Sequence, residues 1–390
     1  MRNNIPILFN FLKKKDKQEN RLINQDALDN AILLSMLYIS RNTRLDGRFV
    51  YRNSATSAKK YSDRKYSSLR HAGTLYSMYL CERYLNNDTL KNKRVLASNY
   101  LVKNYIKRVN ADRYGLVSKP DEEAPVYLAT SGGTGLALIA LSNLLPEKLI
   151  SVHTLRKMGN FLLWMQSNDG DFWPSYEFVK KEKSILHSAR YYPGEACLGL
   201  LYLYEVDKDE RWLIGVQKGI MHIARTANEK PEHDIKFDHW GILAAQKLFQ
   251  TENNGLTDAQ KAIITGFVEK NVKSILELQN TDPKDDEYGS FRGTRTLCGL
   301  ATLMEGLIAA YDCVPAKVMK TRIKYAIEAG LEHLYKYQVK SGEMEGGIPG
   351  TYIWNTPAAD DKDREVRIDN VQHAISAWIT YKKLLNSEKN

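Results

Sequence analysis

The sequence has 390 residues, of which 43% are hydrophobic, and it carries a formal net charge of +10. This hydrophobic fraction is ordinary for a globular protein and excludes a largely disordered chain. The length allows one large domain or two smaller ones. The basic residues are dispersed, with Lys13–Lys15 as the only tight run. This distribution favours a solvated basic surface over a nucleic-acid site, so we expect no nucleic-acid partner.

The N-terminal residues 1–17 contain an apolar run that is shorter than the core of a usual signal peptide, and no small-residue cleavage site follows it. We therefore expect neither a signal peptide nor a membrane span. The four cysteines lie far apart, each inside an apolar helical pattern: Cys81, Cys197, Cys298 and Cys313. This spacing predicts buried free thiols, which suit a reducing compartment, and we expect a cytoplasmic protein.

Helical periodicity dominates the chain, and alternating strand patterns are scarce. Amphipathic helices are predicted over residues 26–41, 91–109, 152–166, 211–227, 257–279 and 314–338. Each is followed by a more apolar helix, over residues 67–85, 135–145, 195–204, 238–249, 294–311 and 369–385. An amphipathic helix covers a core with one face, whereas an apolar helix must be buried on all sides. The sequence therefore predicts six hairpins of one outer and one inner helix.

Six such hairpins can close into a ring, with the apolar helices as an inner barrel and no end left to cap. Three outer helices end in a glutamine, and each glutamine precedes a turn with a glycine and an aromatic or aliphatic residue. These sets are Gln166 with Gly170 and Phe172, Gln279 with Gly289 and Phe291, and Gln338 with Gly347 and Ile348. Glutamine there can satisfy backbone groups at the helix end. We predict a basic tail over residues 1–25 and a single all-α toroid domain over residues 26–390.

This pattern resembles the (α/α)6 toroid superfamily over nearly the whole chain. That superfamily includes N-acylglucosamine 2-epimerases and related sugar isomerases, glycoside hydrolases, polysaccharide lyases, glucuronyl C5-epimerases and terpene cyclases. The resemblance implies a cleft where the inner helices begin, but the fold alone does not choose among these activities. Terpene cyclisation fits less well, because the acidic DxDD motif of those enzymes is absent.

The junctions that lead into the inner helices are rich in aromatic, arginine and acidic residues, which suit a saccharide because aromatic rings stack on sugar faces and charged groups bind hydroxyls. The candidate binding residues are Arg48, Arg70, His71, Asp171, Arg190, Tyr191, Tyr192, Trp240, Arg292, Arg295, Arg367 and Asp369. The arginines make an acidic sugar a plausible substrate. Helix capping is the competing interpretation for Asp238 and Asp369, which lie near predicted helix starts.

Two histidines, His239 and His373, lie near the start of the fourth and sixth inner helices. Histidine titrates near neutrality, which suits reversible proton transfer beside a carbonyl group. The resemblance to N-acylglucosamine 2-epimerases implies an acid/base pair at these positions. The chain departs from that family at Ile242, where a glutamate is usual, and its final helix lacks the family's proline and arginine after His373. A satisfied structural histidine is the competing interpretation for each.

Other readings of the same cleft remain open. An inverting glycosidase would use two acids across the cavity, Asp171 or Glu195 facing Asp238 or Asp369. A tyrosine–histidine pair such as Tyr192 with His239 would serve β-elimination or C5 epimerisation. A third reading is a toroid that binds a glycan without catalysis. We favour the sugar epimerase or isomerase.

The sequence contains no phosphate-binding loop, no dinucleotide fingerprint, no nucleophile elbow and no HExxH motif. We therefore expect no cofactor and predict no metal site. The oligomeric state is not predicted. The glycine-rich segment Ser341–Arg367 is either a lid over the cavity or an ordered loop that lines it.

Overall fold

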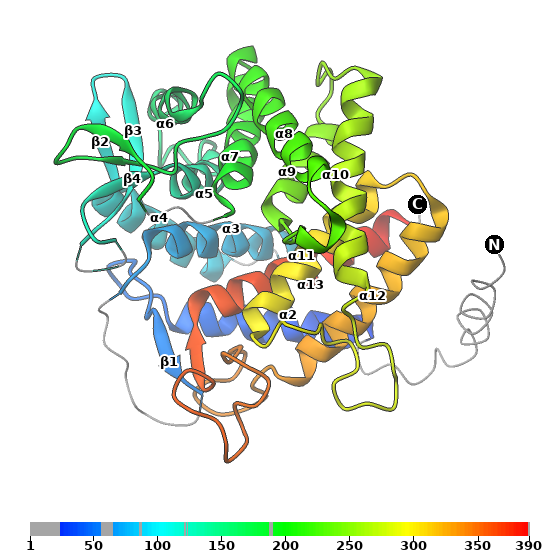
Figure 1. The fold of residues 1–390 in the computed structure, drawn as a ribbon. Coiled ribbons are helices and arrows are strands. Elements are labelled where there is room, and N and C mark those ends of the chain that lie inside the picture. Colours follow the sequence, from blue (N-terminus) through cyan, green and yellow to red (C-terminus); the bar gives the residue numbers. More distant parts are fainter. Residues whose placement is uncertain are drawn as a thin grey trace.

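The computed structural model describes residues 24–55, 65–85, 88–120, 122, 124–186 and 190–388. In these residues twelve α-helices alternate between an outer and an inner layer (Figure 1). The outer helices are α2 (Gln25–Arg41), α4 (Asp88–Tyr105), α6 (Val152–Met165), α8 (Glu210–Glu229), α10 (Asp258–Leu276) and α12 (Lys317–Lys336). The inner helices are α3 (Ser68–Leu85), α5 (Ser131–Ser142), α7 (Tyr192–Asp207), α9 (His239–Gln250), α11 (Leu297–Cys313) and α13 (Ile368–Ser387). The predicted tail, residues 1–25, lies outside the described residues except for its last two.

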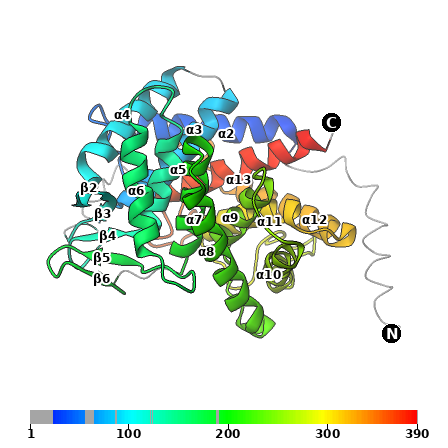
Figure 2. The ribbon, with the colours of Figure 1, turned by 90° about the horizontal axis from the view of Figure 1, so that it is seen from above.

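The inner helices form a closed ring. Each packs against the next in chain order from α3 to α13, and α13 packs against α3. In the view from above, α13 lies beside both α2 and α3, so the two ends of the helical array meet (Figure 2). The outer helices pack on this ring and on one another. The predicted (α/α)6 toroid of six helical hairpins is therefore confirmed, whereas its extent as a single domain stays a prediction.

The two layers differ in burial as their sequence patterns predict. In the outer helix α8, Trp212, Val216, Ile220 and Ile223 are buried at intervals of four, four and three residues, which place them on one helical face. In the inner helix α5 every residue is buried. The amphipathic pattern of the outer layer and the apolar pattern of the inner layer thus follow from their positions in the ring.

The glutamines at the ends of three outer helices join neighbouring outer helices. The side-chain amide of Gln338 donates to the carbonyl oxygen of Ala31 in α2, at 2.8 Å, and so ties the last outer helix to the first. Gln166 and Gln279 donate in the same way to Gly215 in α8 and Ala326 in α12, each at 2.9 Å. The glutamines therefore satisfy carbonyl groups of the next outer helix rather than of their own.

The turns after these glutamines place a glycine against the same neighbouring helix. Gly346 has a φ of +84°, and a Cβ atom there would lie 1.9 Å from the carbonyl oxygen of Leu34 in α2. Gly170 and Gly289 make the equivalent approach to α8 and α12. A side chain would be both strained and obstructed at these positions. In the third turn this glycine is Gly346, which directly precedes Gly347.

The structure also contains strands that the sequence pattern does not reveal. A five-stranded antiparallel sheet has the order β2 (Ile106–Asn110), β3 (Arg113–Ser118), β4 (Leu128–Thr130), β5 (Ser175–Glu177) and β6 (Glu182–Ser184), and β1 (Arg52–Ser54) pairs with β7 (Glu365–Arg367). The helix predicted to reach residue 109 therefore ends at Tyr105. The last four residues of β3 are all buried, so the strand lacks the alternation of a half-exposed strand.

Helix α5 begins at Ser131, four residues before its predicted start, because its glycines lie inside the helix rather than in a preceding turn. They allow a close approach of α7. A Cβ atom on Gly199 of α7 would lie 2.5 Å from the Cα atom of Gly135. Backbone contact therefore sets the spacing of these two inner helices.

The thiols of Cys81, Cys197 and Cys313 are free and buried as predicted, whereas Cys298 is free but only partly buried. None of the described helices combines the length and the apolar character that crossing a bilayer requires.

We expect Gly199→Ala to lower the free energy of unfolding by about 1–3 kcal/mol, because the added methyl group overpacks the contact between α5 and α7. Urea denaturation followed by circular dichroism measures this change. The matched control is Gly266→Ala in α10, where the atom nearest to an added Cβ would lie 3.5 Å away. The control is expected to be neutral or stabilising, because alanine is the better helix former. Equal stability of the two variants would contradict the prediction.

Candidate active site

A cavity of about 1180 Å³ opens at the N-terminal ends of the inner helices. Every inner helix contributes to its wall, with Arg70 from α3, Leu136 from α5, Glu195 from α7, His239 from α9, Cys298 from α11 and His373 from α13. The segment 341–367 also lines it, through residues that include Gly350, Thr351, Lys362 and Asp363. Thr351 is held there by a 2.7 Å hydrogen bond to Asp363, which supports the ordered-loop reading of this segment.

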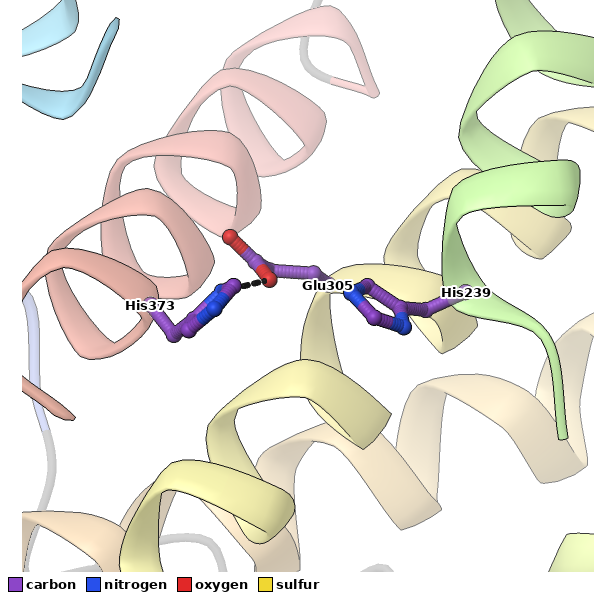
Figure 3. Close-up of side chains that lie close together, drawn as sticks. All are labelled: His239, Glu305 and His373. Atoms are coloured by element: carbon purple, nitrogen blue, oxygen red, sulfur yellow. Dashed lines mark hydrogen bonds and ion pairs between the residues drawn. The ribbon is translucent and has the colours of Figure 1, made fainter. Parts of the chain in front are cut away.

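Three side chains from three inner helices meet at the wall of this cavity: His239 and His373, which line it, and Glu305, which contacts His373. Figure 3 shows Glu305 of α11 between the two imidazole rings, which come from α9 and α13. The Nδ1 atom of His373 lies 2.7 Å from Oε2 of Glu305, and the two ring centroids are 5.9 Å apart. Tyr191 packs edge-on against His239 with a centroid separation of 4.9 Å.

The surroundings push the two histidines towards opposite protonation states. Burial lowers the pKa of His239 well below its ordinary value, and the nearby positive charges of His373 and Arg190 lower it further. Its Nε2 atom is buried and has no hydrogen-bond partner among the described residues. Burial alone would lower the pKa of His373 too, but the Glu305 carboxylate outweighs it and raises that pKa above 6.5. Burial thus favours the neutral form of His239, and the Glu305 carboxylate favours the protonated form of His373.

The same three residues offer a set of metal-ligand atoms that all lie within 4.8 Å of one another. Two histidines and a glutamate are a donor set typical of zinc. The sequence does not reveal this set, because its members are scattered through the chain. The 2.7 Å contact from His373 to Glu305 is, however, a hydrogen-bond distance, and it is shorter than the separation of two ligands around a tetrahedral zinc ion.

Two arginines share one carboxylate at the start of α13. Asp369 pairs with Nε of Arg70 at 2.8 Å and with the guanidinium of Arg367, also at 2.8 Å. Burial by itself would raise the pKa of Asp369, but the two guanidinium groups outweigh it and lower that pKa to about 2. Arg70 also donates to the hydroxyl of Tyr51 at 2.7 Å. Asp369 is thus a permanent anion inside a cluster of net positive charge.

Glu195 is a buried acid with the opposite behaviour. It lies in the first turn of α7, and only 4% of its surface is exposed. Burial, with a smaller contribution from the charge of Asp238, raises the pKa of Glu195 to about 8. Its carboxyl group is therefore mostly neutral at pH 7.

Half of the residues predicted from sequence line the cavity: Arg70, Tyr191, Glu195, His239, Trp240, Arg367, Asp369 and His373. The remaining eight do not, and each has a local explanation in the structure.

Two of them are in the packing behind the cavity wall. His71 is fully buried, and its ring nitrogens lie 2.6 Å from the Tyr66 hydroxyl and 2.8 Å from the Ala97 carbonyl oxygen. The guanidinium of Arg48 stacks over the ring of Tyr66. These residues fit the structural reading rather than ligand binding.

Two acids among the eight are held by backbone amides. Asp238 is the N-cap of α9 and accepts a 3.1 Å hydrogen bond from the amide of Gly241, as the capping interpretation anticipated. Asp171 accepts a 2.8 Å hydrogen bond from the amide of Phe172, in the turn that approaches α8.

The other four lie at or beyond the cavity edge. Arg190 is exposed and donates to the hydroxyl of Tyr191, while Tyr192 packs against Gly132 of α5. It is therefore Tyr191, not Tyr192, that contacts His239. Arg292 and Arg295 line a separate, smaller pocket of about 420 Å³.

Sequence reasoning missed Glu305, the residue that contacts His373. A signal was available, because Glu305 is the only charged residue between Leu297 and Tyr311, a stretch that is otherwise apolar or uncharged. A lone carboxylate in a buried helix needs a partner, and such residues are often functional. Ile242, three residues after His239, is fully buried, and the acid that contacts His373 comes from α11.

Comparisons with known proteins agree with the architecture. No family model matches the sequence, and no curated protein matches it. Among solved structures, cellobiose 2-epimerase from Bacillus thermoamylovorans is similar with a TM-score of 0.65 and 13% identity, covering 90% of this chain and 97% of that one. A D-mannose isomerase has a TM-score of 0.67 at 12% identity, covering 92% and 98%. An α-1,6-mannanase from Salegentibacter, in complex with α-1,6-mannotriose, has a TM-score of 0.60 at 12% identity, covering 92% and 99%. The chain thus has the (α/α)6 toroid fold of these proteins.

We expect Glu305→Gln to lower the pKa of His373. The substitution removes the carboxylate charge that raises this pKa and leaves the burial that opposes it. Titration of the isotope-labelled imidazole by NMR measures the change. As a control, Glu343→Gln in an exposed loop is expected to leave the His373 titration where it is in the wild type. An unaltered pKa in Glu305→Gln would show that Glu305 is not the controlling charge.

Proposed function

We propose that this protein is a sugar epimerase or isomerase that acts on a saccharide with a free reducing end through His239 and His373. The observation that carries the proposal is the pair of imidazoles in one cavity, with opposite pKa shifts. One offers an Nε2 atom that can accept a proton, and the other is held as an imidazolium by Glu305. Structural similarity to a cellobiose 2-epimerase and a D-mannose isomerase over at least 90% of the chain supports this choice.

The two chemistries share their first step, in which a base removes the proton from the carbon next to the sugar carbonyl. In this proposal neutral His239 is the base, and the electron pair of the C–H bond moves onto the carbonyl oxygen to give an enediolate. His373, as imidazolium, returns a proton to the sugar. Return to the same carbon from the other face gives the epimer. Return to the neighbouring carbon, together with transfer of the proton of the C2 hydroxyl to the C1 oxygen, gives the isomer. Such acid/base pairs contribute on the order of 100- to 10,000-fold each.

The Arg70–Asp369–Arg367 cluster has a binding role in this scheme. Its guanidinium groups are fixed by the shared carboxylate and can hold sugar oxygens in place, which reduces the entropic cost of reaching the reactive geometry. The cluster carries one net positive charge, so it can also stabilise negative charge on the enediolate. Trp240 lines the same cavity and offers an apolar surface for a sugar face.

We expect His239→Ala and His373→Ala each to lower the rate of C2-proton exchange by at least about 100-fold. Cellobiose, mannose and a panel of other reducing sugars, incubated with the protein in deuterated buffer, are followed by NMR. The matched control is His222→Ala in α8, which faces Asp169 and Asp171 away from the cavity and is expected to exchange like the wild type. If both site variants also exchange at the wild-type rate, the epimerase proposal fails.

Acid/base catalysis and a zinc site at the same residues are distinguished by whether the activity requires a metal ion. We expect activity to survive incubation with a chelator and dialysis, because His373 and Glu305 already satisfy one another. Metal content by mass spectrometry and activity before and after chelation test this expectation. Loss of activity that zinc alone restores would reassign His239, Glu305 and His373 as ligands.

Glycoside hydrolysis is less well supported by the acids of the cavity. Asp369 is ion-paired, Asp238 caps α9, and Asp171 lies in a turn beside α8, so each of the three acids considered as partner or alternative to Glu195 already has another role in the structure. The similarity to an α-1,6-mannanase keeps this reading testable. Release of new reducing ends from mannan, retained in His239→Ala, would favour hydrolysis over epimerisation.

A further inference from the structure

The carboxyl group of Glu195 belongs to the described cavity wall and makes no ion pair or helix cap with the described residues. It lines the cavity, is 4% exposed, and has no hydrogen-bond partner among the described residues. Its position is rigid, because the residue lies in the first turn of a helix that is packed backbone-to-backbone against α5. A buried acid without a protein partner leaves its hydrogen-bonding capacity for a ligand.

The elements packed around Glu195 determine its charge state. Gly132 on α5 leaves room for the Glu195 side chain, because a Cβ atom there would lie 2.0 Å from Oε2 of Glu195. Helix α5 carries no titratable side chain. The negative charge of Asp238, just before α9, favours the neutral form of Glu195. The positive charges of His373 on α13 and Arg70 on α3 favour its carboxylate form. Burial outweighs these cations, and the pKa of Glu195 rises to about 8.

We propose that Glu195 is a catalytic residue that acts as a neutral carboxylic acid, donating a hydrogen bond to the sugar carbonyl oxygen and to the enediolate formed from it. This role rests on the proposed epimerase or isomerase function and adds a residue to it. The proposal also defines the ligand chemistry of the site, which is a carbonyl oxygen that becomes an oxyanion. A neutral donor is suited to this task, because a carboxylate would repel the developing charge.

The step balances without any further reactant. His239 takes the proton as the C–H bond breaks, and the electron pair of that bond moves through carbon to the carbonyl oxygen. Glu195 shares its proton with this oxygen in a hydrogen bond and keeps it, so the residue ends the cycle unchanged. His373 then delivers a proton to carbon as the electron pair returns. Exchange with solvent restores the starting protonation of the two histidines.

The other acids of the site cannot take this role. Asp369 is anionic, because its two arginines lower its pKa to about 2. Glu305 accepts from His373, so its charge is used to hold the imidazolium. Glu195 combines burial, a free hydrogen-bonding group and a raised pKa in the wall of this cavity.

The test compares Glu195→Gln with Glu195→Ala in the full-length protein, using C2-proton exchange in reducing sugars as the readout. The amide of glutamine still donates a hydrogen bond and has nearly the same shape, so kcat/KM is expected to stay within about tenfold of the wild type. Alanine removes the donor, and a loss of about 100- to 1,000-fold is expected, mainly in kcat. Circular dichroism and thermal unfolding establish that each variant is folded.

The pH profile distinguishes the neutral donor from a structural role. Because the raised pKa of Glu195 is about 8, the wild type holds the active, protonated form below pH 8 and loses it as the pH rises above that value. Activity is therefore expected to fall on the alkaline side, approaching about tenfold per pH unit. In Glu195→Gln the part of this decline that belongs to Glu195 is expected to be lost, because the amide does not titrate, and the decline that remains follows the deprotonation of His373.

A third variant tests the electrostatic cause. Asp238→Asn removes the negative charge that helps to raise the pKa of Glu195, so the alkaline decline is expected to begin at lower pH. Asparagine can still cap α9. If Glu195→Gln is as inactive as Glu195→Ala, or keeps the wild-type alkaline decline, the neutral-donor role is wrong. The profile of Glu195→Gln decides the matter even if the alanine variant does not fold. Failure of the proposed function itself is recognised separately, by unaltered exchange in His239→Ala and His373→Ala.

Discussion

The contact on which the whole structure depends is the one that closes the ring, where α13 packs between α11 and α3. Helical hairpins that did not close would expose the apolar surfaces of the first and last inner helices. Closure of the ring buries both surfaces. The outer layer closes in the same way, because Gln338 and Gly346 contact the backbone of α2. These interactions use backbone carbonyls and a glycine rather than large side chains, so they require an accurate approach of the helices.

Closure also brings together charges that no single hairpin could support. His239, Glu305 and His373 come from three inner helices, and Arg70 reaches Asp369 from a fourth. Burying an isolated charge is costly, but each of these ions has a partner across the cavity. His239 and Glu195 are the exceptions, because each avoids this cost when it is neutral. In the proposed chemistry neutral His239 accepts a proton, and neutral Glu195 donates a hydrogen bond. The electrostatics and the proposed chemistry thus have a common origin in burial.

The architecture could be predicted from the sequence because it depends on helical periodicity. The site could be predicted only in part, because it depends on contacts between residues that are far apart in the chain. The alternation of amphipathic and apolar helices predicted all twelve elements, and His239 with His373 followed from their places near helix starts. The strands were missed, because the buried end of β3 shows no alternation. Glu305 was missed because it lies eight residues into α11, far from the junctions where polar residues were sought. Arg48 and His71 do not line the cavity, and composition cannot distinguish a cavity wall from the packing behind it.

The order in which the helices of the ring are synthesised determines when the ring can close. Strand β1, near the start of the described chain, pairs with β7, and α2 and α3 need α13, more than 280 residues later, to complete their burial. Contacts of such long sequence separation form late, because the entropic cost of closing the loop comes before the contacts that offset it. A nascent chain would therefore carry five hairpins without a complete cavity, and His373 of α13 would arrive last. Synthesis of the final helix completes both the barrel and the cluster of His239, Glu305 and His373.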